Sequence, residues 1–516
     1  MSGARRTRDR LLALGAVLLA CSACVEPASR DVTADRAFCE QIHGTEPRLA
    51  TYLAPFDSLM IERTGVYSLE EGDQSMIARA WLTDAAETSI DVQYFIFSAD
   101  NVGLIAVEHL LRAAERGVRV RLLVDDFMIE TDADALLALD AHPNLEIRLY
   151  NPTTNIGKNL PTKFISLTTD FRGFNQRMHN KAVIVDRRVV ITGGRNIADE
   201  YFDYDHAYNF RDRDVLLLGG VATAVQRSFD EFWEHPLSVP IATLVETPVA
   251  DAVVRQTAAY LHAYACDPTN FWPQVRERIT AVPETFAQIV SSGSLAWVDS
   301  VEFISDAPGK NDGSEGLGGG GASTDALIAL IRGAERSVTI QSPYLVTTSL
   351  SQDLFKEVIA RGVQVRVLTN SLASTDNLEA FSGYQRERTR LLGLGVELYE
   401  FRPDAAVRRE VMSGTLQERL QFTPIFGLHA KSMVIDGRTA VIGTFNLDPR
   451  SANLNTECVT VIRDVQVAEA LMRAMEVDMR PENAWHTTAE FNPDGEAPFR
   501  KRLKAWTRRI VPRAVL

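Results

Sequence analysis

The chain has 516 residues, enough for two or more domains, and its 46% hydrophobic and 24% charged residues are typical of globular proteins. This composition excludes disorder as the main state, and no apolar run reaches the ~18 residues that a polytopic membrane protein needs for each span. The net charge is −14, and the residues after position 20 carry 50 basic against 67 acidic side chains, a charge of −17. Such a chain is a poor general partner for DNA unless one cleft is locally basic.

Residues 1–21 are typical of a lipoprotein signal peptide. Four arginines lie among the first ten residues and precede the apolar run 11–20, which ends at Cys21. The sequence Leu-Leu-Ala-Cys at 18–21 resembles the bacterial lipobox, in which the cysteine is lipidated and becomes the first mature residue. Two alternatives stay open: a plain signal cut near Ala23, and lipidation at Cys24.

This segment predicts a lipid-anchored protein on the periplasmic side of the bacterial cell envelope. Ser22, directly after Cys21, favours the outer membrane over the inner one. Export to an oxidising compartment permits a disulfide among Cys39, Cys266 and Cys458, and we expect Cys39 to pair with Cys266.

The sequence contains an internal duplication. Three pairs of similar segments recur at offsets of 248, 245 and 250 residues: 86–93 with 334–341, 116–121 with 361–366, and 178–181 with 428–431. Three matches at nearly one offset indicate two copies of the same unit.

Each copy predicts alternating strands and helices. In the first copy, the expected elements are a strand at 90–97, a helix at 103–116, a strand at 118–124, a second helix and a strand at 146–150. In the second copy, they are a strand at 338–346, a helix at 351–361, a strand at 363–368, a second helix and a strand at 396–401. Gly117 and Gly362 stand where a glycine ends a helix. We therefore predict an α/β fold of two pseudo-symmetric halves, each a mixed, mainly parallel β-sheet flanked by helices.

The composition suggests six consecutive regions. They are a signal peptide (1–21), an N-terminal extension (22–64), a first domain (65–245), a connecting segment (246–323), a second domain (324–482) and a basic tail (483–516). The connecting segment ends in the glycine-rich stretch 313–323, which lacks the Gly-Lys-Ser/Thr ending of a phosphate loop. It predicts a flexible linker between the copies or a loop just before the second copy.

The residues with the clearest chemical meaning are two His-x-Lys pairs. His179 and Lys181 in the first copy, like His429 and Lys431 in the second, are two residues apart on a predicted strand and share one face of it. The full spacing His-x-Lys-x4-Asp-x6-Gly-(Gly/Thr)-x-Asn occurs twice and adds Asp186, Asp436, Asn196 and Asn446. Imidazole, ammonium and amide groups suit an anionic phosphate, whereas the ammonium would repel a metal cation. We predict no cofactor and no metal.

The double motif, at 179–186 and 429–436, resembles the HKD motifs of the phospholipase D superfamily, and the likeness is closer still to bacterial cardiolipin synthases. The segments 116–126, 193–201, 342–344 and 446–457 also fit, so the resemblance runs from about residue 65 to 470. The chain departs from it at Thr444, where the family usually has serine, and after about residue 482.

The resemblance implies one shared site in which a histidine attacks phosphorus and the other protonates the leaving alcohol. It implies His179 as nucleophile and His429 as acid, or the reverse by symmetry, with the lysines and asparagines neutralising the phosphate oxygens. It also implies Glu457 as the carboxylate behind His429, and Asp212 behind His179, with Asp214 as the alternative to Asp212. Asp186 and Asp436 are interpreted as structural.

The resemblance implies a phosphatidyltransferase that moves a phosphatidyl group between phospholipids at a membrane surface. A hydrolytic phospholipase D or phosphodiesterase that releases phosphatidic acid would use the same residues. A nuclease and a non-catalytic lipid-binding protein are disfavoured, the first by the acidic charge and the second by two intact motifs. The expected substrates are phosphatidylglycerol and, as the other candidate, phosphatidylethanolamine. Whether an accessory protein takes part is left open, and nucleic acid is not expected.

The basic tail has two interpretations. Residues 500–513 carry seven cationic side chains in fourteen, and Phe499, Leu503, Trp506 and Ile510 would form one apolar stripe on a helix. The helix either lies on an anionic bilayer, or it is a solvated or domain-packing terminal helix whose aromatic side chains belong to the core.

Overall fold

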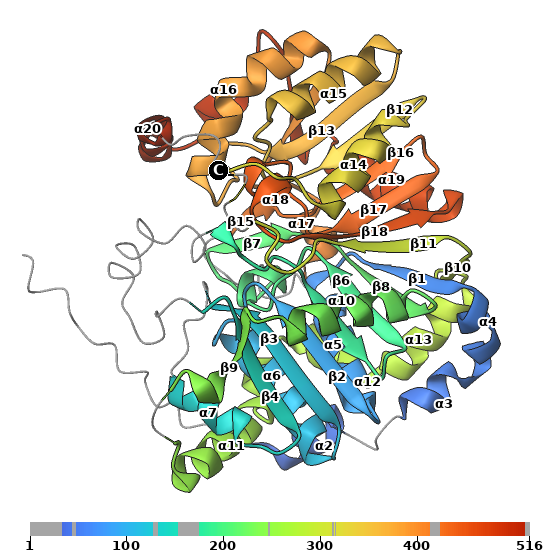
Figure 1. The fold of residues 1–516 in the computed structure, drawn as a ribbon, viewed down its shortest axis with the longest axis vertical. Helices are drawn as coiled ribbons and strands as arrows, with labels where there is room; N and C mark the ends of the chain where they lie inside the picture. Colours follow the sequence, from blue (N-terminus) through green and yellow to red (C-terminus); the bar gives the residue numbers. More distant parts are fainter. Residues whose placement is uncertain are drawn as a thin grey trace, which may run out of the picture. The chain divides into compact units, whose positions relative to one another are not determined.

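The computed structural model describes residues 34–43, 48–126, 133–152, 175–245, 248–311, 314, 316–412 and 424–510 (Figure 1). The predicted signal peptide, with Cys21 and Cys24, lies outside the described residues. None of the helices in the described part of the chain has the length and apolar composition that a transmembrane segment requires.

The first half of the chain forms a nine-stranded sheet. Its strands, in spatial order, are β10 (Ala296–Val298), β1 (Thr64–Leu69), β8 (Asp214–Gly219), β6 (Val189–Gly193), β5 (Ala182–Val185), β2 (Ser89–Tyr94), β3 (Arg119–Asp125), β4 (Leu145–Tyr150) and β9 (Ser238–Pro240).

The second half forms an eight-stranded sheet with the corresponding order. Its strands are β11 (Val301–Ser305), β18 (Cys458–Arg463), β17 (Thr439–Gly443), β16 (Ser432–Ile435), β12 (Ser337–Gln341), β13 (Gln364–Asn370), β14 (Glu397–Phe401) and β19 (Ala484–Thr487). The predicted α/β class with two pseudo-symmetric halves is confirmed. The connecting segment supplies a strand to each sheet, β10 and β11, and the C-terminal region begins with β19 at the edge of the second sheet.

The share of parallel strand pairs is smaller than the sequence predicted. Parallel pairing within the two large sheets is confined to β2–β3–β4 and β12–β13–β14, which are the strands joined by helical crossovers. The strands that follow each His-x-Lys pair fold back as hairpins, β5–β6 and β16–β17, and extend each sheet with antiparallel neighbours.

The predicted strands and helices of the duplicated unit are present with small shifts. The first helix of each copy is α6 (Asn101–Glu115) or α15 (Ser349–Ala360), and Gly117 and Gly362 follow them with φ of +96° and +90°. The strands predicted to end at Phe97 and Val346 leave their sheets earlier, because their last apolar residues form isolated bridges between loops, Phe97 with Ile197 and Leu345 with Leu447.

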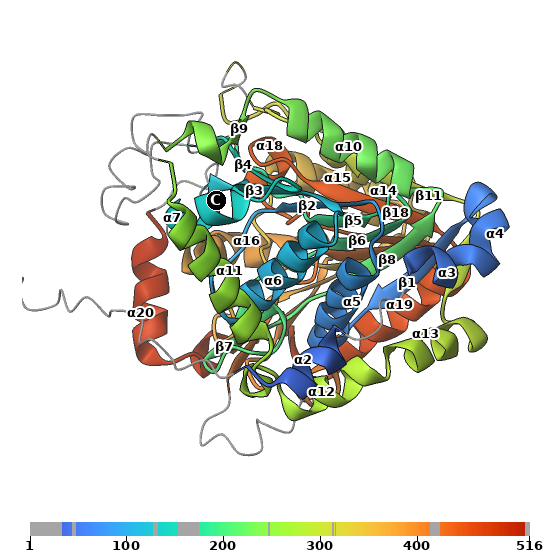
Figure 2. The same ribbon diagram turned by 90° about the horizontal axis from the view of Figure 1, so that it is seen from below.

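One hydrophobic core spans both halves. The helices α10 (Ala222–Glu234) and α19 (Val465–Asp478) pack into it between residues of both sheets, among them Ile184, Val190 and Leu217 of the first and Val434, Ile442 and Ile462 of the second. Alternate residues of the second sheet face α14 (Ala322–Arg332), α15 and α16 (Leu378–Leu394) instead. On the first sheet, α5 (Gly72–Ala85) and α6 lie on the face opposite α10 (Figure 2). The two halves are therefore held together through shared apolar side chains.

The cysteine prediction is confirmed. Cys39, on α2 (Arg36–Ile42), forms a disulfide with Cys266 at the end of α11 (Asp251–Ala265), and Cys458 is a buried free thiol. The disulfide joins the N-terminal part of the described chain to the connecting segment.

Candidate active site

Each His-x-Lys pair lies at the start of a β-hairpin. His179 and Lys181 directly precede β5, and His429 and Lys431 directly precede β16. At the other end of these strands, Asp186 accepts hydrogen bonds from the backbone N–H groups of residues 87–89, and Asp436 accepts them from residues 335–337. The two carboxylates therefore tie each hairpin turn to the start of the neighbouring strand and lie apart from the imidazoles.

Two strand pairings between the halves bring the motifs together. The short strand β7 (Tyr208–Arg211) runs parallel to β15 (Ile425–Leu428), with Arg211 opposite Leu428. A parallel bridge likewise places Met178 opposite Thr456. The residues that follow these positions must meet, so His429 lies beside Asp212 and His179 lies beside Glu457.

The carboxylate assignment implied by the family resemblance is therefore wrong in its pairing. His179 Nδ1 is 2.8 Å from Glu457 Oε2, and His429 Nδ1 is 2.6 Å from Asp212 Oδ2. Each histidine is oriented by an acid from the opposite half, because strand pairing across the halves, not proximity in sequence, determines the neighbours. With Nδ1 occupied, Nε2 of each ring is left for substrate.

Asp214, the alternative to Asp212, has a structural role. Its carboxylate accepts hydrogen bonds from Ser75 Oγ at 2.8 Å and from Arg79 at 2.9 Å, and it also contacts Arg195. These contacts hold α5 to β8, away from either catalytic imidazole.

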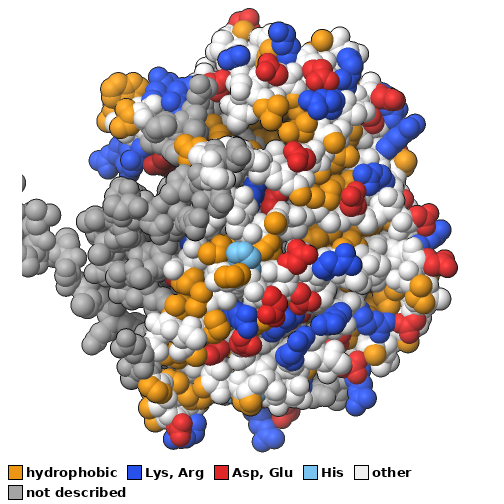
Figure 3. Space-filling model, viewed as in Figure 1, with side chains coloured by type: hydrophobic (Ala, Val, Ile, Leu, Met, Phe, Trp, Pro, Cys, Tyr) orange, Lys and Arg blue, Asp and Glu red, His pale blue; other side chains and the backbone are white. Residues whose placement is uncertain are grey.

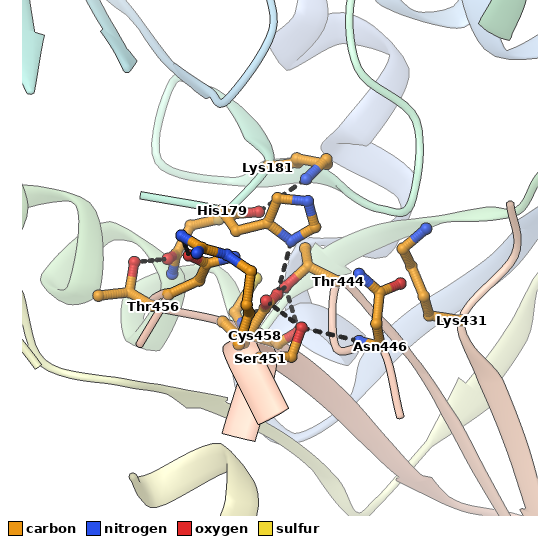
Figure 4. Close-up of polar contacts among 12 residues, drawn as sticks. His179, Lys181, Lys431, Thr444, Asn446, Ser451, Thr456 and Cys458 are labelled. Atoms are coloured by element: carbon orange, nitrogen blue, oxygen red, sulfur yellow. Dashed lines mark hydrogen bonds and ion pairs between the residues drawn. The ribbon is translucent and has the colours of Figure 1, made fainter. Parts of the chain in front are cut away.

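The two orienting carboxylates are themselves held in different ways. Glu457 accepts hydrogen bonds from the hydroxyl groups of Thr444, at 2.5 Å, and Ser451, at 2.7 Å (Figure 4). The bond uses only the hydroxyl group of Thr444, which the expected serine would also offer. Asp212 accepts a hydrogen bond from the backbone N–H of Arg213 at 2.7 Å, and its carboxylate lies against Gly194.

The sequence motifs did not indicate the buried charges that fix the segment around Asp212. Arg213 donates to Glu70 at 2.6 Å and to Gln341 of the second half at 2.8 Å. Arg211 contacts Asp478 at 3.1 Å, and Gln341 donates to the same carboxylate. The two arginines beside Asp212 could have been noticed only as part of the charged run 211–214 between β7 and β8.

Both lysines of the motifs are buried, with 1% of Lys181 and 4% of Lys431 exposed. Each ammonium group donates a hydrogen bond to the backbone carbonyl of the histidine in its own motif, at 2.8 Å for Lys181. Burial lowers the pKa of Lys181 to about 8 and that of Lys431 to about 7, although nearby carboxylates oppose the change. At pH 7 Lys181 is therefore mostly charged, whereas Lys431 is only about half protonated, and both lose their charge above about pH 8.

Burial also lowers the pKa of both histidines. The pKa of His179 falls to about 4, and that of His429 falls to about 3, in the latter with a further contribution from the Lys431 ammonium. Both imidazoles are thus neutral at pH 7. An anionic phosphate placed between the rings would raise both values, since it favours the imidazolium form.

Asn196 and Asn446 are buried beside the motifs, as the repeated spacing predicts. Asn196 Oδ1 accepts a hydrogen bond from the backbone N–H of Ile96 at 3.2 Å, so its amide NH₂ is turned away from that contact. Figure 4 shows Asn446 beside Lys431, near His179. The two halves together bring two imidazoles, two ammonium groups and two amides into one site.

This fold and this site define a two-motif enzyme of the phospholipase D type. The chain matches the family described as "Cardiolipin synthase, PLD-like domain" twice, over residues 82–233 and 327–479. It is 35% identical to cardiolipin synthase C of Escherichia coli, with 82% of this chain and 87% of that protein covered. It is 31% identical to an uncharacterized protein of Helicobacter pylori, with 84% of each chain covered. The chain therefore belongs to the cardiolipin synthase branch of the phospholipase D-like enzymes.

A solved structure shares the fold. The crystal structure of phosphatidylserine synthase from Haemophilus influenzae superposes with a TM-score of 0.55 at 15% identity, covering 89% of this chain and 97% of that one. At this identity the likeness concerns the arrangement of the two halves alone.

The contact between Gly194 and Asp212 gives a first test of the site. A Cβ atom at position 194 would lie 2.1 Å from Asp212 Oδ1, so Gly194→Ala must displace the carboxylate that orients His429. We expect kcat to fall by about 10²-fold or more, because small misplacements of catalytic groups have effects of that size.

A matched control uses Gly393 on α16, where an added Cβ meets no other atom within 4 Å. Gly393→Ala should leave kcat unchanged and raise the free energy of unfolding by up to about 1 kcal/mol. Full activity of a folded Gly194→Ala protein, with folding checked by circular dichroism, would contradict the role of Asp212.

The lysine pKa values predict the alkaline limb of the pH profile. Because Lys431 is protonated only below pH of about 7 and Lys181 below about 8, kcat/KM for an anionic phosphodiester should decline above this range. In Lys431→Arg the guanidinium stays charged, so the limb should move to higher pH even if the maximal rate drops. Lys356→Arg, at an exposed position on α15, serves as the control. An unmoved limb in Lys431→Arg would show that another group titrates.

Proposed function

We propose that this protein is a phosphatidyltransferase of the cardiolipin synthase type, which transfers a phosphatidyl group from one phospholipid to a hydroxyl group of another. The observation that carries the proposal is the pair of buried imidazoles, each held at Nδ1 by a carboxylate of the opposite half and flanked by a buried ammonium group. The name and the extensive similarity of the E. coli relative support this choice of reaction.

In the proposed first step, Nε2 of His179 attacks the phosphorus of the donor lipid. The bond from phosphorus to the headgroup oxygen breaks, and that oxygen takes a proton from Nε2 of His429, so that the headgroup alcohol leaves and a phosphohistidine remains. Lys181 and Lys431, with the amides of Asn196 and Asn446, balance the charge on the phosphate oxygens.

In the second step, the acceptor alcohol gives its proton to the now neutral His429 as its oxygen attacks the phosphohistidine. The phosphorus–nitrogen bond breaks and His179 returns to its starting state. His429 needs a proton at the outset, and the phosphate anion bound beside it favours that protonated form. His179 needs to be neutral, which its lowered pKa provides.

Product analysis tests the reaction. With labelled phosphatidylglycerol alone, we expect cardiolipin and glycerol; if phosphatidylethanolamine is used as a donor, ethanolamine should be released as well. Phosphatidic acid as the main product would assign a hydrolase instead. His179→Ala and His429→Ala should each reduce turnover by about 10³-fold or more. Rapid acid-free quenching and peptide mapping of the labelled phosphohistidine should place it on His179, and a label on His429 would reverse the two roles.

We further propose that the enzyme binds anionic membranes through its C-terminal helix α20 (Phe499–Arg508). The four residues of the apolar stripe are exposed: Phe499 by 69%, Leu503 by 52%, Trp506 by 64% and Ile510 by 87%. Figure 3 shows this apolar surface flanked by basic side chains, at the upper left where α20 lies in Figure 1. The expectation that these aromatics pack into the core is wrong, because the helix uses another face for packing.

The packing face of α20 connects the helix to the active-site region. Ala505 is buried, and Lys501 donates hydrogen bonds to the backbone carbonyls of Ala373 at 2.9 Å and Thr375 at 2.7 Å. The next residue, Asp376, accepts a hydrogen bond from Tyr344, and its carboxylate raises the pKa of the Lys431 ammonium group. A bilayer bound to the stripe would therefore lie close to the residues that surround the bound phosphate.

A lipid anchor at Cys21 on the periplasmic side of the envelope, with the outer membrane favoured, is part of the same proposal. The Cys39–Cys266 disulfide supports an oxidising compartment. Membrane binding by α20 is best measured in the Cys21→Ser protein, where the anchor is removed. Continued lipid labelling of that protein would assign the anchor to Cys24.

In this background, we expect binding to phosphatidylglycerol vesicles that weakens between about 0.05 and 0.5 M salt, since each basic side chain near the surface contributes about 1 kcal/mol. Leu503→Ser combined with Trp506→Ser should reduce binding by about tenfold or more, because it removes the apolar contact. Leu350→Ser, which alters an exposed leucine on α15, is the matched control. Unchanged vesicle binding by the double variant would contradict the membrane role. Normal activity of the double variant on a dispersed short-chain lipid would show that its catalytic site is intact, so that a loss of membrane binding is distinguished from a loss of catalysis.

A further inference from the structure

A second cluster of ionisable side chains lies where the N-terminal helix α2 meets the first half. His43 directly follows α2, Asp84 lies in the last turn of α5, and Glu108 and His109 are neighbours on α6. None of these residues belongs to the duplicated motifs, and the proposed transfer reaction does not use them.

The four side chains converge. His109 Nδ1 is 2.8 Å from Asp84 Oδ1, His43 Nδ1 is 3.6 Å from Asp84 Oδ2, and His43 Nε2 is 3.4 Å from Glu108 Oε2. His43, Asp84 and His109 each offer one potential ligand atom, and these atoms all lie within 4.8 Å of one another.

Several of the polar atoms in this cluster lack hydrogen bonds although they are buried. Neither ring nitrogen of His43 has a hydrogen-bond partner, and neither does Glu108 Oε2. The Glu108 side chain is fully buried, and its other oxygen accepts a hydrogen bond from His262 at 3.0 Å. Buried polar atoms are nearly always hydrogen-bonded, so a His43 ring that faces two carboxylates only at ion-pair distances of 3.4 and 3.6 Å indicates a position for an ion.

We propose that His43, Asp84 and His109 form a zinc site. Two imidazole nitrogens and one carboxylate oxygen are a donor set that Zn²⁺ accepts in tetrahedral geometry with water as the fourth ligand, whereas Ca²⁺ and Mg²⁺ prefer oxygen ligands alone.

A cavity of about 410 Å³ adjoins the cluster, lined by His43, Asp84 and His109 together with apolar residues such as Trp81 and Phe271. It provides an entry path for the ion and room for the side chains to close around it. The sulfur atoms of Cys39 and Cys266 are also near His43, but they form the disulfide and are not thiolates. The imidazole and carboxylate groups are consequently the ligands available in the oxidised protein.

The zinc site would fasten α2 to the body of the enzyme. Cys39 and His43 are four residues apart, so they lie on the same side of α2. The disulfide joins that side to the end of α11, and the zinc ion would join it to α5 and α6. The role of the ion is structural and is separate from phosphoryl transfer.

The test is zinc binding by the purified, oxidised full-length protein. We expect about one Zn²⁺ per chain after dialysis, measured by inductively coupled plasma mass spectrometry, and visible d–d absorption of tetrahedral intensity when Co²⁺ replaces it. His43→Gln and Asp84→Asn should each weaken zinc binding by about tenfold or more, because each removes a ligand. His486→Gln, at an exposed histidine that stacks on Tyr399 of the second sheet, is the matched control and should bind zinc as the wild type does.

Two further measurements keep the outcome clear. Zinc should raise the midpoint of thermal unfolding of the wild type but not of His43→Gln, and both variants should keep their circular dichroism spectrum and lipid turnover. Absence of zinc binding by the wild type, or equal binding by His43→Gln, would overturn the proposal. Zinc that binds only after reduction, and is lost in Cys39→Ser, would assign the metal to the thiols and overturn it as well.

Discussion

The exchange of carboxylates between the two halves is the interaction on which the active site depends. Parallel pairing of β7 with β15 places Asp212 beside His429, and the bridge from Met178 to Thr456 places Glu457 beside His179. Neither half contains a complete catalytic group, because each imidazole requires an acid from the other half to fix its tautomer. The shared apolar core and the Arg213–Gln341 contact then serve catalysis as well as stability, since they hold the halves in the register that this exchange needs.

The site also shows how an acidic chain can bind an anionic phosphate. Two buried ammonium groups and two imidazoles are concentrated at the contact between the halves, while the excess of negative charge is spread over the rest of the chain. Burying cations is costly, as the lowered pKa values of Lys181 and Lys431 reflect. Asp212 and Glu457 offset part of that cost, and a bound phosphate would offset more. Local charge, rather than net charge, therefore determines which ligand this site attracts.

Much of the fold and of the site could be predicted from the sequence, because the relevant signals are local. The spacing from His179 to Asn196 and the glycine after each first helix lie within single elements or hairpins, and the repeat is visible because such local patterns occur twice. The pairing of each histidine with its acid could not be predicted, since it depends on a strand contact between residues more than 200 positions apart, such as Arg211 and Leu428. The cluster around His43 was missed for the same reason: its members are single residues on three helices, with no common spacing.

The two copies of the motif have diverged where the chemistry requires different roles. In the first copy, Gly194 leaves space for the short carboxylate of Asp212, which the backbone of Arg213 holds. In the second, Thr444 occupies the position equivalent to Gly194 and donates its hydroxyl to the longer Glu457, which Ser451 also holds. In the proposed reaction one imidazole is neutral while the other is protonated, so the two histidines need different surroundings. The unequal support of the two carboxylates makes those surroundings differ, although the motif itself is duplicated.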